Sequence, residues 1–201
     1  MFHNILNRES GGKKQPKAIP VTLSTRIRLA RNLRKFPFPG RAEVSQKRAV
    51  LSKCIDAISG IKGLNNSISV EVDDLSELDR QILVEQHLIS PELSQVKEGS
   101  GIVLTQDRSC CIIINEEDHL RIQVLRPGID FSSVWKDADE LDTGIESAIS
   151  YAYDGDLGFL TACPTNLGTG MRASVMMHLP GLVMSKNMDR VINAVNHLGI
   201  A

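Results

Sequence analysis

Four arginines stand close together near the start of the sequence, at Arg26, Arg28, Arg31 and Arg34. The segment Val21 to Arg28 alternates in character and predicts a β-strand, on which residues two apart share a face. Ser24, Arg26 and Arg28 would then point the same way. Two guanidinium groups on one rigid strand suit a polyphosphate, because each can donate paired hydrogen bonds to its oxygens. A solvated basic strand or an RNA-binding patch is the alternative interpretation.

An acidic run, Asn-Glu-Glu-Asp-His-Leu-Arg, follows an apolar stretch and ends at Arg121. If this run is extended, Glu117, His119 and Arg121 share one face of the strand. Glu116 and Asp118 then take the opposite face. A cation bound at Glu117 would also face Arg121, so the pattern favours a catalytic base or an anion clamp over a metal site. A charged turn with surface ion pairs is the alternative.

The segment Thr161 to Arg172 holds polar residues and glycines that let backbone approach a ligand closely. It matches neither the phosphate loop that ends in Gly-Lys-Ser/Thr nor the dinucleotide-binding glycine motif. Within it, Cys163 has the best case for reactivity among the cysteines, because an arginine nearby would stabilise its thiolate. A buried structural cysteine before a turn is the alternative.

Strands and helices between these segments must hold them together. The expected strands cover residues 21–28, 67–72, 102–105, 110–115, 119–125 and 157–162. The expected helices cover residues 43–59, 74–88, 135–152 and 188–198. Strands joined by short turns, with helices between the groups, predict an α+β fold with a largely antiparallel sheet flanked by helices.

Composition and charge exclude several classes of protein. Of the 201 residues, 42% are hydrophobic, which is enough for a sizeable core. Lys and Arg number 23 and Asp and Glu number 24, so nucleic-acid binding by bulk positive charge is not indicated. No apolar run is long enough to cross a bilayer, so no membrane partner is expected.

The lack of a secretory signal in residues 1–18 and the pattern of the cysteines favour a cytoplasmic location. Residues 1–18 are polar and basic, lack the apolar stretch of a secretory signal, and are expected to form a flexible arm. The four cysteines have neither disulfide-framework nor metal-ligand spacing. A cytoplasmic location is therefore predicted.

Taken together, the three segments resemble the motifs of the ATP:guanido phosphotransferase family. Ser24–Asn32 is similar to the first nucleotide motif, Asn115–Arg121 to the acidic motif, and Cys163–Met176 to the cysteine signature. Two further segments, Val84–Pro91 and Met176–Pro180, are similar to the branch of the family that phosphorylates arginine side chains in proteins. The resemblance runs from about Ile19 to Gly199.

The resemblance implies a role for each matching residue. Glu117 would be the catalytic carboxylate that faces the substrate guanidinium, and Cys163 would lie beside that guanidinium. His87 would flank the nucleotide, although a lone histidine near a helix end is more often structural. The ATP-binding residues implied by the resemblance are Ser24, Thr25, Arg26, Ile27, Arg28, His87, Arg121, Arg172, Ala173, Ser174, Val175 and Met176. Mg²⁺ would be held mainly by phosphates and water, with no metal site on the protein.

The activity implied is transfer of the ATP γ-phosphate to arginine side chains of proteins. In family members that act on small guanidines, a helical domain precedes the first arginine motif. Here that motif begins at Ser24, which favours a protein substrate. By resemblance, the partners would be protein substrates that present arginine, an activator protein and the Clp protease machinery.

The family pattern continues beyond Gly199 with a glycine-rich segment that carries another phosphate-binding arginine and a second substrate carboxylate. The sequence given ends at Ala201, so we expect residues 19–201 to form the catalytic domain without its C-terminal part. The alternative to an active kinase is therefore a catalytically incomplete fragment that binds ATP or a partner.

Overall fold

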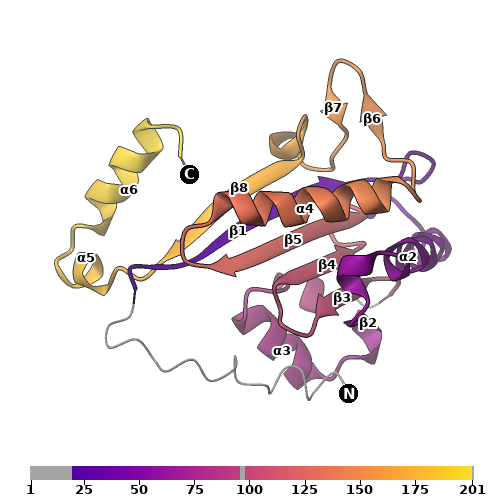
Figure 1. Ribbon diagram of the computed structural model, residues 1–201, viewed down its shortest axis with the longest axis horizontal. Helices are drawn as coiled ribbons and strands as arrows, with labels where there is room; N and C mark the ends of the chain where they lie inside the picture. Colours follow the sequence, from indigo (N-terminus) through magenta and orange to yellow (C-terminus); the bar gives the residue numbers. More distant parts are fainter. Residues whose placement is uncertain (1–19, 96–97, 201) are drawn as a thin grey trace.

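A computed structural model describes residues 20–95 and 98–200 (Figure 1). The expected N-terminal arm, residues 1–18, lies outside the described residues. The strands are β1 (Thr22–Arg31), β2 (Ser67–Glu71), β3 (Gly101–Thr105), β4 (Cys110–Ile114), β5 (Leu120–Pro127), β6 (Tyr153–Asp154), β7 (Gly158–Phe159) and β8 (Met171–Met177). The α-helices are α2 (Val44–Ser59), α3 (Glu77–Glu85), α4 (Phe131–Glu146), α5 (Pro180–Met184) and α6 (Met188–His197).

Six strands form one sheet in the order β2-β3-β4-β5-β1-β8, and every neighbouring pair is antiparallel. Strands β6 and β7 form a separate hairpin that projects from the top of the molecule in Figure 1. The prediction of an α+β fold with a largely antiparallel sheet is confirmed. No helix among the described residues has the length and apolar character needed to cross a membrane.

The two faces of the sheet differ in what covers them. We call the face that carries Ile27 and Leu29 the back face, and the face that carries Arg26 and Arg28 the front face. On the back face, β1, β4 and β5 pack against α2 and α4, and together they bury the larger of two apolar cores. Burial of each large apolar side chain stabilises such a core by about 1.5–3 kcal/mol.

The front face is only partly covered. Apolar residues of β3 and β4, including Ile102 and Ile113, pack against α3 and the segment that follows it, which forms the smaller core. Leu83 of α3 is completely buried there. Among the residues that the structure describes, no such apolar cluster covers the front of β5, β1 and β8, and the polar residues described below lie on it.

Several element boundaries differ from the sequence prediction. Helix α4 begins at Phe131 rather than at 135, because the Asp130 carboxylate accepts a hydrogen bond from Ser133 N at 3.1 Å and caps it. Helix α3 begins only after Ser76, whose hydroxyl accepts from Asp79 N at 3.1 Å. Strand β8 was not predicted, and the strand expected at 157–162 is reduced to the two residues of β7.

Candidate active site

The strand register gathers four arginines on the front face. Arg26 of β1 lies opposite Ser174 of β8, and Arg28 lies opposite Arg172. On the other side of β1, Ala30 pairs with Arg121 of β5. Directly paired residues of an antiparallel sheet project to the same face. Arg26, Arg28, Arg121 and Arg172 therefore converge from three adjacent strands.

Within the described part of the chain, three of these arginines form no ion pair with a carboxylate. Among residues 20–95 and 98–200, no ion pair involves Arg26, Arg28 or Arg172. Burial and the neighbouring guanidinium groups lower the pKa of Arg28 to about 10, and the same causes lower the pKa of Arg26. Glu116 offsets part of the charge on Arg28, but among the described residues the arginines outnumber the carboxylates here, and a bound anion would neutralise the remaining positive charge.

A small pocket of about 130 Å³ opens among these arginines. It brings together Arg28, Arg121 and Arg172 with Glu117 and Cys163, which lie far apart in the sequence. The rest of its lining consists of Leu29, Ala30, Asp118, Thr165, Asn166 and Gly170. Several cations around a carboxylate and a thiol suit a reaction between an anion and a cationic group.

A second pocket of about 310 Å³ lies on the same face toward the start of β1. Its lining contains the predicted residues Ser24, Arg26, His87, Ser174, Val175 and Met176, together with Gln86 and Leu125. The Arg26 Nε donates to the Ser174 hydroxyl at 3.2 Å, which orders the floor between the two strands. Mixed aliphatic and polar walls suit an uncharged heterocycle joined to an anionic group.

The acidic run does not continue the strand. Asn115 adopts a positive φ of 57°, and the four residues after it form a bend before β5. The expectation depended on an extended run, and this condition is not met: His119 does not share a face with Glu117 and Arg121, although these two still line the same pocket. His119 is completely buried, whereas the Glu117 side chain is 46% exposed and its carboxylate lies 4.0 Å from the Arg121 guanidinium.

His119 anchors this bend to the end of β1. Its Nδ1 accepts from Leu33 N at 3.0 Å, and its Nε2 lies 2.9 Å from the carbonyl oxygen of Pro37. A carbonyl can only accept, so Nε2 carries the proton and the ring is neutral. Burial lowers the pKa of His119 and favours this neutral form.

Asp118 joins the acidic bend to the segment before Cys163. Its Oδ1 accepts from the Asn32 amide at 2.6 Å and from Ala162 N at 2.7 Å. The Asn32 amide oxygen in turn accepts from His119 N at 2.9 Å. This network fixes the two segments that present Glu117 and Cys163 relative to each other.

The cysteine segment is held against the sheet by close backbone contact. Gly170 has a φ of 61°, and a Cβ there would lie 2.6 Å from the Ala30 carbonyl oxygen, so only glycine fits. Arg31 donates to the Thr169 carbonyl at 3.0 Å. The half-exposed Cys163 sulfur lies 3.0 Å from the Thr165 hydroxyl.

Some sequence-predicted residues are not brought to the pockets. The side chains of Thr25 and Ile27 are buried on the back face, where Thr25 donates to the Gly128 carbonyl at 2.6 Å. Ala173 lies opposite Ile27 and lines neither pocket. Arg31 is buried in an ion pair with Asp142, so it does not join the front-face arginines.

Sequence reasoning did not assign roles to Asn32, Glu116 or Asp118. The signal for the bend was Asn115, because asparagine is among the residues that most often adopt positive φ. Among the described residues, no three or more His, Cys, Asp or Glu side chains gather as a metal site would require.

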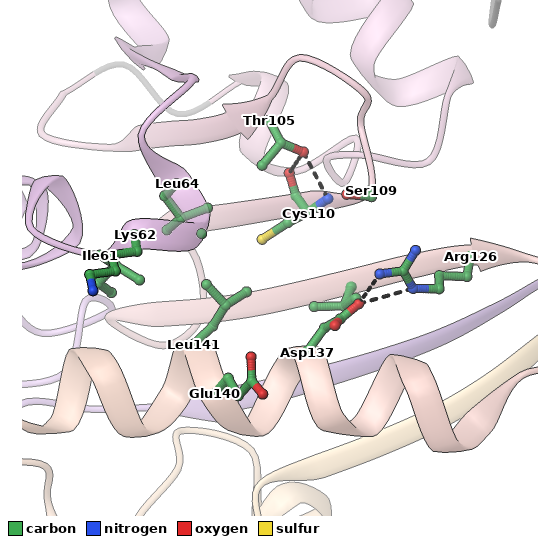
Figure 2. A pocket seen from close by; sticks show the side chains of 12 residues that line it. Ile61, Lys62, Leu64, Thr105, Ser109, Cys110, Arg126, Asp137, Glu140 and Leu141 are labelled. Carbon is green, nitrogen blue, oxygen red and sulfur yellow. Dashed lines mark hydrogen bonds and ion pairs between the residues drawn. The ribbon is translucent and has the colours of Figure 1, made fainter.

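A larger cavity of about 360 Å³ lies on the back face between α4 and the sheet (Figure 2). The Arg126 guanidinium forms an ion pair with Asp137 at its edge, and the Cys110 sulfur points toward its interior. Burial raises the pKa of the Cys110 thiol to about 12, so this thiol is not reactive near neutral pH. The cavity contains none of the sequence-predicted site residues.

Comparison with known proteins places this geometry in context. Residues 49–201 match the family described as ATP:guanido phosphotransferase, C-terminal catalytic domain. A protein-arginine kinase of Halothermothrix orenii is 44% identical over 180 residues, which cover 90% of this chain and 51% of that protein. The protein-arginine kinase of Caldanaerobacter subterraneus subsp. tengcongensis is 46% identical over 184 residues, covering 90% and 54%. The chain thus spans about half the length of the curated relatives it matches.

Solved structures agree on the fold. The duplicated taurocyamine kinase from Schistosoma mansoni with bound transition-state-analogue components matches with a TM-score of 0.77 and 27% identity, over 92% of this chain and 27% of that chain. Lombricine kinase matches with a TM-score of 0.71 over 96% of this chain and 61% of that chain. At 22% identity, this second likeness concerns the fold alone.

Proposed function

Because the chain belongs to the ATP:guanido phosphotransferase family, we propose that it binds ATP on the front face and transfers the γ-phosphate to arginine side chains of proteins. One observation carries the proposal: three arginines line one pocket with Glu117 and Cys163. Two of them, Arg28 and Arg172, form no ion pair among the described residues. The arginines of such a site attract an anion, and Glu117 and Cys163 can face a cationic group.

The phosphate chain of ATP would lie along the arginines. Phosphoryl transfer depends mostly on alignment and on neutralising charge, and guanidinium groups supply both. Arg26 and Ser174 connect the larger pocket, which would hold the base and sugar, to the smaller one. Mg²⁺, which the family implies, would be held by phosphate oxygens and water.

The acceptor chemistry assigns roles to Glu117 and Cys163. An arginine side chain is protonated at neutral pH, so its nitrogen cannot attack until a proton leaves. The Glu117 carboxylate can hold the planar guanidinium by paired hydrogen bonds and accept that proton. Cys163 lines the same pocket and, as a thiolate, would add a negative contact to the cation.

The choice of a protein substrate rests on the relatives and on the shape of the site. The curated relatives are named protein-arginine kinase. The Glu117 side chain is 46% exposed, so an arginine presented on another protein could reach it. The same proposal includes a cytoplasmic location, which the free cysteines favour, and interaction with an activator protein and the Clp protease machinery.

The test measures transfer of labelled γ-phosphate from ATP to an arginine-rich protein, detected as acid-labile phosphate. We expect Glu117→Gln to lower the transfer rate by about 100-fold or more, because it removes the proton acceptor. ATP affinity should change by less than about threefold, since Glu117 binds the acceptor rather than the phosphates. Glu140→Gln, an exposed change on the back-face helix α4, is the matched control and should leave both unchanged. Unaltered transfer in Glu117→Gln would contradict the proposed role.

A second candidate is ATP binding without transfer. It is favoured by the observation that the chain spans about half the length of the curated relatives. Calorimetry with MgATP, combined with the transfer assay on the same preparation, separates the two. Saturable binding without acid-labile product supports the second candidate, and both together support the first.

A further inference from the structure

The three consecutive acidic side chains Glu116, Glu117 and Asp118 diverge at the bend between β4 and β5. The bend itself is fixed by Asn115, whose amide donates to the carbonyls of Lys47 at 2.8 Å and Gly99 at 2.7 Å. Glu117 is the exposed member at 46%, whereas the Glu116 side chain is only 8% exposed. A carboxylate that is removed from water in this way needs a compensating partner.

Glu116 has two partners, and both lie in segments that resemble family motifs. Its Oε1 accepts a hydrogen bond from the Ser90 hydroxyl. Its Oε2 forms an ion pair with Nη1 of Arg121 at a distance of 2.5 Å. Among the described residues, this buried oxygen accepts no hydrogen bond. The Ser90 hydroxyl also accepts from Leu93 N at 3.1 Å, which fixes its orientation. Ser90 thus orients the Glu116 side chain, and Glu116 orients the Arg121 side chain.

Arg121 is held at one end and open at the other. Nη1 contacts Glu116, whereas Nη2 lies 4.0 Å from Glu117 at the small pocket that Arg121 lines. A free arginine side chain must lose rotamer entropy when it is immobilised on a ligand. An arginine already fixed by a buried ion pair has lost that freedom before the ligand arrives.

We infer that Glu116 is a positioning residue: together with Ser90 it fixes the Arg121 guanidinium at the edge of the pocket for binding a phosphate group. This inference rests on the proposed function, because it assumes that a phosphate chain binds among the arginines. It assigns a different task to each carboxylate of the bend. Glu116 orients the phosphate clamp, Glu117 faces the acceptor, and Asp118 holds the cysteine segment.

An effect of charge and an effect of positioning predict opposite changes in the affinity for an anion when Glu116 is replaced. If Glu116 acted only as a nearby negative charge, Glu116→Gln would strengthen the binding of an anion by removing repulsion. If it positions Arg121, the same change weakens binding. A purely structural role would lower the melting temperature without changing the affinity of the folded protein.

The experiment titrates the full chain with MgATP and with inorganic tripolyphosphate by calorimetry, beside thermal melts. We expect Glu116→Gln to weaken both affinities by about tenfold and Ser90→Ala by about threefold. Ser90→Thr, which keeps the hydroxyl donor, should restore the affinity of the wild type. If Glu116→Gln does not fold, the Ser90→Ala and Ser90→Thr pair decides the matter by the same criterion.

Unchanged or tighter binding in the folded Glu116→Gln or Ser90→Ala variant would overturn this inference and leave the proposed function standing. Absence of binding in the wild-type chain would overturn both. Failure of the inference is therefore distinguishable from failure of the proposed function.

Discussion

Arg28 and Arg31 lie three residues apart on β1, yet the two faces of the sheet place them in opposite environments. On the back face, Arg31 is buried, lies 2.7 Å from the Asp142 carboxylate of α4, and its guanidinium carbon lies 3.6 Å from the centre of the Phe159 ring. On the front face, Arg28 is half-buried among other arginines and has no ion pair within the described part of the chain.

The comparison distinguishes arginines whose charge stabilises the fold from arginines whose charge is available to bind a ligand. The ion-paired arginines Arg31 and Arg126 contact carboxylates of α4, where charge is compensated within the protein. The front-face arginines repel one another, which destabilises the unliganded protein and favours an anion among them. Removing one arginine from each face should therefore change stability in opposite directions.

The largest effect is expected from Arg31→Met. The change leaves the Asp142 carboxylate without its cation and removes the hydrogen bond to the Thr169 carbonyl. We expect the free energy of unfolding to fall by about 3–5 kcal/mol, as for other broken buried ion pairs. Urea unfolding monitored by circular dichroism measures it, and Arg34→Met, at an exposed position, is the control. A loss within 1 kcal/mol would show that this pair does not stabilise the fold.

On the front face, Arg28→Met should change the free energy of unfolding in the opposite direction. It removes one charge from a cluster of like charges, so the unliganded protein should gain about 0.5–1 kcal/mol of stability. The thermal melt in nucleotide-free buffer is the measurement, with Arg34→Met again as the control. A clear drop in melting temperature would mean that the attraction between Arg28 and Glu116 outweighs the repulsion from the neighbouring arginines.

The smallest effect concerns pH and the buried His119. Its pKa is lowered in the folded state, so the unfolded chain takes up a proton first as pH falls. Stability is thus fully present above about pH 6.5 and declines below it, by at most about 1 kcal/mol between pH 7 and pH 5.5. Urea midpoints at the two pH values should differ less in His119→Gln, and His178→Gln, at an exposed histidine, should keep the wild-type difference. An identical difference in wild type and His119→Gln would contradict this assignment.

The sequence predicted the front-face arginines of β1 well, because strand periodicity alone determines that Arg26 and Arg28 share a face. It failed at the acidic run, where the same periodicity was applied to a segment that Asn115 bends. There, hydrogen bonds to Lys47 and Gly99 decide the conformation, and such long-range contacts leave no local pattern.

Strand β8 was missed for a different physical reason. It lies at the edge of the sheet as this structure describes it, and its side chains are exposed or half-buried on both faces. Neither the alternation of a half-buried strand nor the apolar run of a central strand develops in such a position. Residues assigned to it by family resemblance, such as Arg172, nevertheless lie at the pocket.

The central claim is that the arginines of the front face bind the phosphate chain of ATP. Calorimetric titration of the wild type, Arg28→Met and Arg34→Met with MgATP tests it most directly. We expect saturable binding by the wild type and Arg34→Met, and binding weakened by at least about tenfold in Arg28→Met, because a charge-assisted contact is lost. Equal affinity in all three proteins, or no binding by the wild type, would contradict the claim.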